Sequence, residues 1–169
     1  MFKKSHTLFV SLMTAALTMT STANVYASSA CEGSSTMTTE QQHVLPVAQA
    51  DGHMVMLLQD SGPMQSKGVI GNGTATDQGM NRLFQGNGEG QGYHTLNTDE
   101  GTVVVKWTGT VNTVMNDNTP NTSFQGSWEV LKGTGKFVNM EGQGVYDGYF
   151  TSANTRVINW KGSCALASN

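Results

Sequence analysis

The chain has 169 residues, 20 glycines, 12% charged residues and a formal net charge of −3 at pH 7. This length suits one domain with one core. The seven Lys and Arg residues after residue 27 are scattered along the sequence, whereas phosphate binding needs a clustered basic surface, so we expect no nucleic-acid partner.

Residues 1–27 have the pattern of a secretory signal peptide. Lys3 and Lys4 precede an uncharged segment from Leu8 to Met19, and a cleavage site with small residues follows at Ala27. The segment is shorter than the roughly 20 residues of a membrane-spanning helix, so we expect no integral membrane span. We predict an exported protein, periplasmic or extracellular. Cleavage removes two of the nine basic residues and none of the twelve acidic ones, which leaves a formal charge of −5.

The two cysteines, Cys31 and Cys164, lie near opposite ends of the mature chain. Disulfides persist in the compartments to which exported proteins go, so we predict that these cysteines pair. Closing so long a loop stabilises a fold by about 4–5 kcal/mol in the chain-entropy model. Two separate thiols are the alternative. Lipidation of Cys31, which follows Ser28-Ser29-Ala30, also remains open.

Residues 28–169 are predicted to form a single all-β domain. No segment after residue 27 places apolar residues at helical spacing, whereas β-branched residues come in short alternating runs between glycine-bearing turns. Eight strands at regular spacing suggest a barrel or a sandwich. Gly-, Asn- and Ser-rich segments at 60–68, 71–92 and 115–121 read as long loops that could carry a binding surface. In chain order, we expect strands at Val44–Gln49, His53–Gln59, Gly68–Gly71, Gly92–Asn97, Thr102–Val111, Ser123–Leu131, Gly142–Phe150 and Asn154–Lys161.

Alternation along two of these strands predicts which side chains face inward. Val103, Val105 and Trp107 share one face of their strand. In the following strand Phe124 and Trp128 share a face, and Gln125 and Glu129 lie on the other. We expect the aromatic faces to point to the interior.

Three further runs extend this pattern into a family resemblance. The segments Gly126–Val130 (GSWEV), Gly133–Phe137 (GTGKF) and Gly142–Tyr146 (GQGVY) resemble the barrel repeat of secreted bacterial proteins with an allene oxide cyclase-like barrel. The GTGKF element is also similar to one in plant dirigent proteins. The resemblance covers residues 90–162. It implies an eight-stranded antiparallel β-barrel with an apolar cavity, a calycin-like shape also used by lipocalins and avidins.

Members of that family include cyclases of fatty-acid epoxides, polyketide cyclases and proteins that steer the coupling of phenol radicals. No catalytic residue of these enzymes can be matched to a position in this sequence, so whether the protein is an enzyme stays open.

His43, His53 and His94 lack the spacing of metal ligands, and we expect no metal and no cofactor. No GxSxG or comparable nucleophile motif occurs.

The leading hypothesis from the sequence is an exported barrel that binds a small apolar or phenolic ligand. One alternative is a cyclase or isomerase that acts on a lipid or polyketide inside the barrel. The other is a structural or interaction protein with a filled barrel. The sequence leaves the oligomeric state undetermined.

Aromatic walls with a few polar side-chain ends suit an amphipathic molecule. The candidates for the cavity or its rim are therefore Tyr93, Trp107, Trp128, Tyr146, Tyr149 and Trp160.

Overall fold

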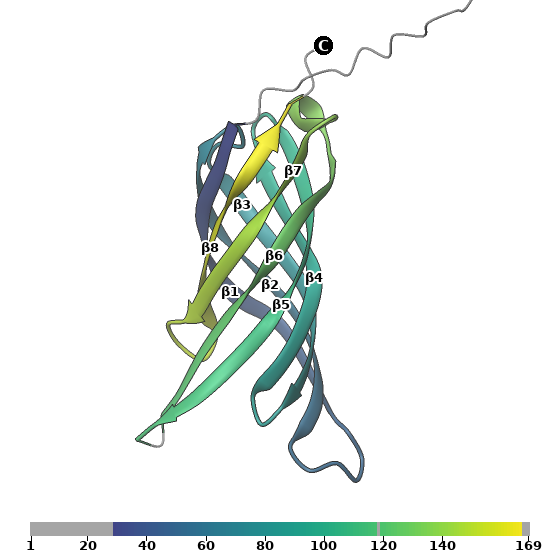
Figure 1. Cartoon of the computed structure of the whole chain (residues 1–169), viewed down its shortest axis with the longest axis vertical. Helices are drawn as coiled ribbons and strands as arrows, with labels where there is room; N and C mark the ends of the chain where they lie inside the picture. Colours follow the sequence, from purple (N-terminus) through teal and green to yellow (C-terminus); the bar gives the residue numbers. More distant parts are fainter. Residues whose placement is uncertain (1–28, 118, 167–169) are drawn as a thin grey trace, which may run out of the picture.

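The computed structural model describes residues 29–117 and 119–166, and the predicted signal peptide lies outside them. Eight antiparallel strands follow one another around a closed barrel, and β8 pairs with β1 to complete it (Figure 1). The all-β barrel predicted from the sequence is therefore confirmed. The elements are β1 (Ser29–Pro46), β2 (His53–Gly68), β3 (Gly73–Phe84), β4 (Asn87–Thr98), β5 (Gly101–Asn116), β6 (Thr119–Gly133), the 3-10 helix η1 (Gly135–Phe137), β7 (Glu141–Phe150) and β8 (Thr155–Ala165).

Several strand boundaries differ from the prediction. The expected loops at 60–68 and 71–92 are the second half of β2, all of β3 and the start of β4. The expected strand at 68–71 is instead the connection between β2 and β3, where Gly68 and Gly71 have φ values of 95° and 81°. Glycine adopts this left-handed region readily and other residues resist it, so these glycines form a turn. β1 also begins earlier than predicted and is largely polar.

Glycines inside the barrel make room for two tryptophans. Trp107 and Trp128 are paired across β5 and β6. The Trp107 ring lies over Gly79 and Gly92, where an added Cβ would come within 2.7 Å of ring atoms. Trp128 lies over two glycines on its other side, Gly144 and Gly162, in the same way. The Trp107 indole thus lies flat over β4 and β3, and the Trp128 indole lies flat over β7 and β8. Neither ring crosses the lumen, so the space between the walls stays open.

The end of the barrel that lies uppermost in Figure 1 contains buried core side chains. It carries the connections β2–β3, β4–β5 and β6–β7, and the last of these contains η1. Ile70, Phe137 and Met140 from two of these connections are buried in the core. Such contacts exclude water and close this end of the lumen.

The predicted disulfide between Cys31 and Cys164 is present and lies at the same end. Its Cα atoms are 5.5 Å apart, and the two cysteines are 133 residues apart in the sequence. Both residues are buried in the core, where the bridge joins β1 to β8 across the seam that closes the barrel. Because the Cys31 sulfur is used in this bond, it cannot form the thioether of a lipoprotein, which corrects that alternative.

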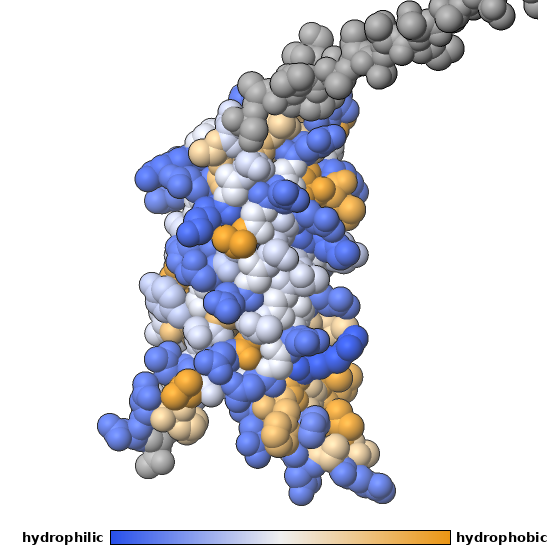
Figure 2. Space-filling model, in the orientation of Figure 1, coloured by the Kyte–Doolittle hydropathy of each residue, from blue (hydrophilic) through white to orange (hydrophobic). Residues whose placement is uncertain are grey.

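The lower end carries the hairpins β1–β2, β3–β4, β5–β6 and β7–β8 (Figure 1). Hydrophobic side chains gather on the surface near these hairpin tips (Figure 2). Among the described residues, no helix is long and apolar enough to cross a membrane. The large hydrophobic residues exposed on the strand ends and connections of this region include Val44, Leu45, Val47, Phe84, Val114 and Met115.

Candidate functional site

A cavity of about 760 Å³ occupies the barrel interior and reaches the hairpins of the lower end. Gly86, Pro120 and Ser152, from three different hairpins, lie at its mouth. Ile70 lies at its deep end, next to the filled part of the core. The barrel is therefore hollow at one end and packed at the other.

Four of the six predicted ligand-binding aromatics line this cavity. They come from β5, β6, β7 and β8 and are Trp107, Trp128, Tyr146 and Trp160. Phe124 and Phe150 also line the cavity, although the sequence analysis did not include them among the candidates. Phe124 could have been found from its inward alternation with Trp128.

The structure does not bring Tyr93 or Tyr149 to the cavity, which corrects that part of the prediction. Their side chains are 49% and 47% exposed on the outer face. The strand period of two explains this, because the adjacent residues His94 and Phe150 line the cavity. Tyr93 lies instead along a separate outer groove of about 440 Å³.

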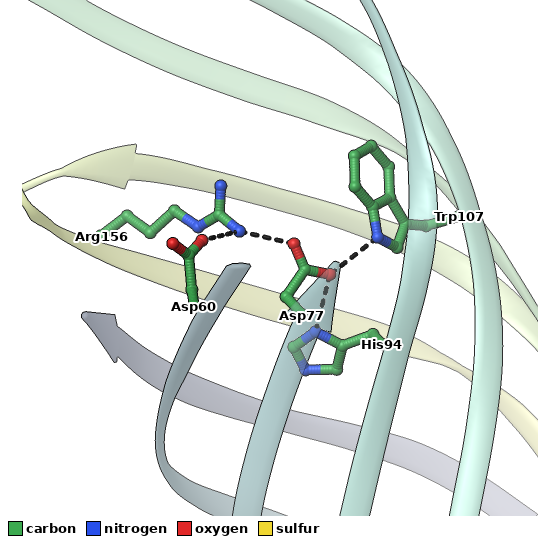
Figure 3. Close-up of polar contacts among 5 residues, drawn as sticks. All are labelled: Asp60, Asp77, His94, Trp107 and Arg156. Carbon is green, nitrogen blue, oxygen red and sulfur yellow. Dashed lines mark hydrogen bonds and ion pairs between the residues drawn. The ribbon is translucent and has the colours of Figure 1, made fainter. Parts of the chain in front are cut away.

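A cluster of buried polar residues lies in the wall of the cavity (Figure 3). Asp60 on β2, Asp77 on β3 and His94 on β4 are direct neighbours in the strand register. Trp107 from β5 and Arg156 from β8 complete the cluster. Each strand contributes one side chain, so the barrel itself sets the positions of these groups.

Asp77 is the centre of this cluster. Its Oδ1 accepts hydrogen bonds from Trp107 Nε1 at 2.8 Å and His94 Nδ1 at 3.2 Å. Its Oδ2 accepts a hydrogen bond from Arg156 Nη2 at 2.6 Å. Because a carboxylate can only accept, His94 carries its proton on Nδ1. His94 Nε2 is buried and has no hydrogen-bond partner among the described residues.

The two aspartates respond oppositely to their surroundings. Burial favours the neutral form of Asp77, but the contacts and charges of His94, Arg156 and Trp107 together outweigh burial and hold its pKa below the usual value. For Asp60, burial dominates over the attraction of Arg156 and raises the pKa. Asp60 is fully buried and forms an ion pair with the same Arg156 nitrogen as Asp77.

This arrangement places two carboxyl groups around a single guanidinium. Two ionised carboxyl groups around one guanidinium leave an excess of one negative charge among these three groups, which is costly in a buried position. A proton on Asp60 balances the charges of the two aspartates and Arg156, and the raised pKa of Asp60 favours that state. Asp77 is then the counter-ion of Arg156.

Several hydrogen-bond donors of the site remain free, among them one on Arg156 and one on Tyr146. Arg156 uses Nη2 for both aspartates, and its other terminal nitrogen, Nη1, points away from them (Figure 3). The Tyr146 hydroxyl forms no hydrogen bond with another described residue, and burial, followed by the negative charge of Asp77, raises its pKa. Tyr146 therefore stays protonated and able to donate. Both residues line the cavity.

The aspartates do not form a metal site with their neighbours. Among the described residues, no group of three or more His, Cys, Asp or Glu side chains could hold a metal ion. Both carboxyl groups are turned to Arg156 instead. Arg156 and Tyr146 can therefore donate hydrogen bonds to a molecule in the apolar cavity.

Sequence reasoning missed this cluster because both aspartates fell within predicted loops, where an Asp is ordinarily solvated. The available signal was the alternation in β3, where Ala75, Asp77, Asn81 and Leu83 are buried in turn.

No family model, curated protein or solved structure matches this chain. The resemblance to allene oxide cyclase-like barrels therefore stays a prediction.

Proposed function

We propose that the protein binds one small, largely apolar molecule noncovalently in the hollow end of the barrel. The observation that carries this proposal is the cavity of about 760 Å³, whose indole rings lie against glycines instead of crossing the lumen. Ligand pockets commonly have volumes of roughly 300–1,000 Å³ with mostly apolar walls and few polar groups. This cavity fits that description.

The walls and the cluster would have separate roles in binding. Leu58, Val105 and Phe124 are among the apolar wall residues, and burial of ligand surface against such walls contributes roughly 25 cal/mol per Å². The free donors of Arg156 and Tyr146 would orient the ligand by holding a polar atom at one place.

The mouth is also suited to an apolar molecule. Phe84 and Val114 are exposed on strands whose ends surround it, and Leu83 and Val111 on the same strands face the cavity. Hydrophobic surface thus lies outside and inside the opening, which supports exchange of a poorly soluble ligand at this end.

A pair of tryptophan substitutions on β5 tests the proposal. Val111 lines the cavity, whereas Val114 is 51% exposed on the outer face. Val111→Trp would fill part of the lumen, and Val114→Trp adds the same side chain outside it. Circular dichroism and thermal melting establish that both variants fold.

Binding would be measured by native mass spectrometry and calorimetry with a panel of long-chain alkanes, alcohols, ketones and alkyl phenols. We expect at least one ligand to bind the wild type and Val114→Trp equally well, and Val111→Trp to bind it at least about tenfold more weakly. Equal binding by Val111→Trp would place the site elsewhere. Failure of every panel member to bind the wild type would contradict the proposal.

A further inference from the structure

We propose that the ligand presents an uncharged hydrogen-bond-accepting oxygen, such as a carbonyl or hydroxyl, to Arg156 and Tyr146, and that the site discriminates against carboxylates. This inference rests on the proposed function and adds the chemical class of the ligand's polar end. Its basis is the set of free donors together with the charges of the buried cluster.

The free groups of Arg156 and Tyr146 are donors, so their partner must be an acceptor; a ligand hydroxyl could in addition donate to His94 Nε2, which has no partner among the described residues. Arg156 Nη1 is turned away from both aspartates (Figure 3), and the Tyr146 hydroxyl has no partner among the described residues. Each carboxylate oxygen of Asp77 already accepts at least one hydrogen bond. A ligand oxygen therefore matches Arg156 and Tyr146 better than an ammonium or amide N–H group does.

The charges of the cluster exclude Arg156 as an anchor for an anion. Asp60 and Asp77 both contact Arg156 Nη2, so the single positive charge is already neutralised. The three residues are buried, with exposed fractions of 8% for Arg156, 2% for Asp77 and 0% for Asp60. A ligand carboxylate would add a negative charge that no described cation in the cavity wall compensates, at the cost of its own hydration.

The surroundings of the Arg156 guanidinium also disfavour an ionised ligand group. The Arg156 Cζ atom lies 5.6 Å from the centre of the Phe124 ring, which covers it with apolar surface. The other basic residues, Lys106, Lys161 and Arg82 among them, do not line the cavity. An ionised group of the ligand would thus contact apolar rings and a guanidinium that the aspartates already neutralise.

A matched ligand series tests whether the site prefers an uncharged oxygen to a carboxylate. The probes are an alkyl methyl ketone, a primary alcohol, a carboxylic acid and an alkane of equal chain length, titrated into the wild-type protein at neutral pH by calorimetry. We expect the ketone and the alcohol to bind at least about tenfold more tightly than the ionised acid. Equal or tighter binding of the acid would overturn this inference and leave the proposed function standing. No binding by any member, the alkane included, would overturn both.

Two tyrosine variants test the role of the donor. Tyr146→Phe removes the hydroxyl that reaches the cavity, and Tyr149→Phe removes an outward hydroxyl on the same strand. We expect Tyr146→Phe to weaken ketone binding about five- to tenfold with alkane binding unchanged, and Tyr149→Phe to change neither. Equal ketone affinity in both variants would show that Tyr146 does not contact the ligand oxygen.

The double variant Asp60→Asn/Asp77→Asn tests the charge argument independently. A single substitution leaves the other carboxyl group free to ionise beside Arg156, but the double variant removes both counter-ions. We expect its acid-to-ketone affinity ratio to rise by at least about tenfold over the wild type. An unchanged ratio in a folded double variant would contradict the charge argument. Should this variant fail to fold, the wild-type ligand series still decides the inference.

Discussion

Replacing Asp60 and Asp77 separately by Asn should have opposite effects on stability, although the two residues are paired neighbours on β2 and β3. Both are buried and both contact Arg156. The difference lies in protonation, because the pKa of Asp77 is lowered and that of Asp60 is raised. The same substitution thus removes a charge from Asp77 but imitates the neutral form of Asp60.

Asp77→Asn should destabilise the protein by about 2–4 kcal/mol at neutral pH. The amide oxygen could still accept from Trp107 and His94, but the amide NH₂ would face the Arg156 nitrogen that now donates at 2.6 Å. Hydrogen bonds to charged groups contribute about 1.5–3 kcal/mol each, and an unpaired buried cation adds to the loss. Ionisation of Asp60 beside Arg156 would offset part of this cost.

Asp60→Asn should change the free energy of unfolding by less than about 1 kcal/mol, with stabilisation the expected direction at neutral pH. Its amide has nearly the same size and shape as the protonated carboxyl group and can take the same place beside Arg156. The substitution also removes a group whose ionisation burial opposes. Asp77 remains in place as the counter-ion.

The pH dependence follows from the directions of the two shifts. The lowered pKa of Asp77 means that its contribution to stability is present above the unfolded value near 3.8 and is lost as pH falls through the folded pKa. The deficit of Asp77→Asn should therefore shrink in strong acid. The raised pKa of Asp60 means that the wild type loses stability as pH rises from 3.8 through the folded value. The advantage of Asp60→Asn should grow over that range.

The assay is equilibrium denaturation followed by tryptophan fluorescence, with the disulfide intact and pH varied from strongly acidic to neutral. Comparable slopes with denaturant would show that the variants unfold as the wild type does. The reasoning is refuted if Asp60→Asn costs as much as Asp77→Asn at neutral pH. It is also refuted if the two differences from the wild type have the same dependence on pH.

Two further predictions concern the barrel itself. Gly79→Ala should destabilise by about 1–3 kcal/mol, because its Cβ would lie 2.7 Å from the Trp107 ring; Gln78→Ala on the outer face should stay within about 0.5 kcal/mol by the same denaturation assay. Replacing Cys31 and Cys164 together by Ala should cost about 2–5 kcal/mol, measured against the oxidised wild type. A melting temperature equal to that of the wild type would show that the bridge does not stabilise the fold.

The general architecture could be predicted from the sequence, but half of the strand boundaries could not. Alternation of Val103, Val105 and Trp107 gave the inward face of β5, and the structure has these side chains inside. The glycine-rich segment that forms the start of β4 looked like a loop because glycine weakens an isolated strand. Its inward glycines are required by Trp107, which lies on a different strand, and such a requirement appears only when the strands are paired.

The candidate site, too, could be predicted from the sequence only in part. Trp107 and Trp128 could be chosen from residue type and alternation. The other four candidates were chosen by residue type alone, and two of them, Tyr93 and Tyr149, face outward. The ionic cluster joins Asp60 and Asp77 to Arg156, which is 79 residues from Asp77 in the sequence. Nothing in the local sequence specifies that pairing, because closure of the barrel brings β8 near β2 and β3 through β1.

Native mass spectrometry of the protein, purified from its own host, would decide whether the lumen is a binding site. We predict a population whose mass exceeds that of the chain by one small organic molecule, and extraction should release a compound with an uncharged oxygen. Val111→Trp should lose that population and Val114→Trp should keep it. The bare mass of the chain, both as purified and after incubation with every ligand of the panel, would contradict the proposed function.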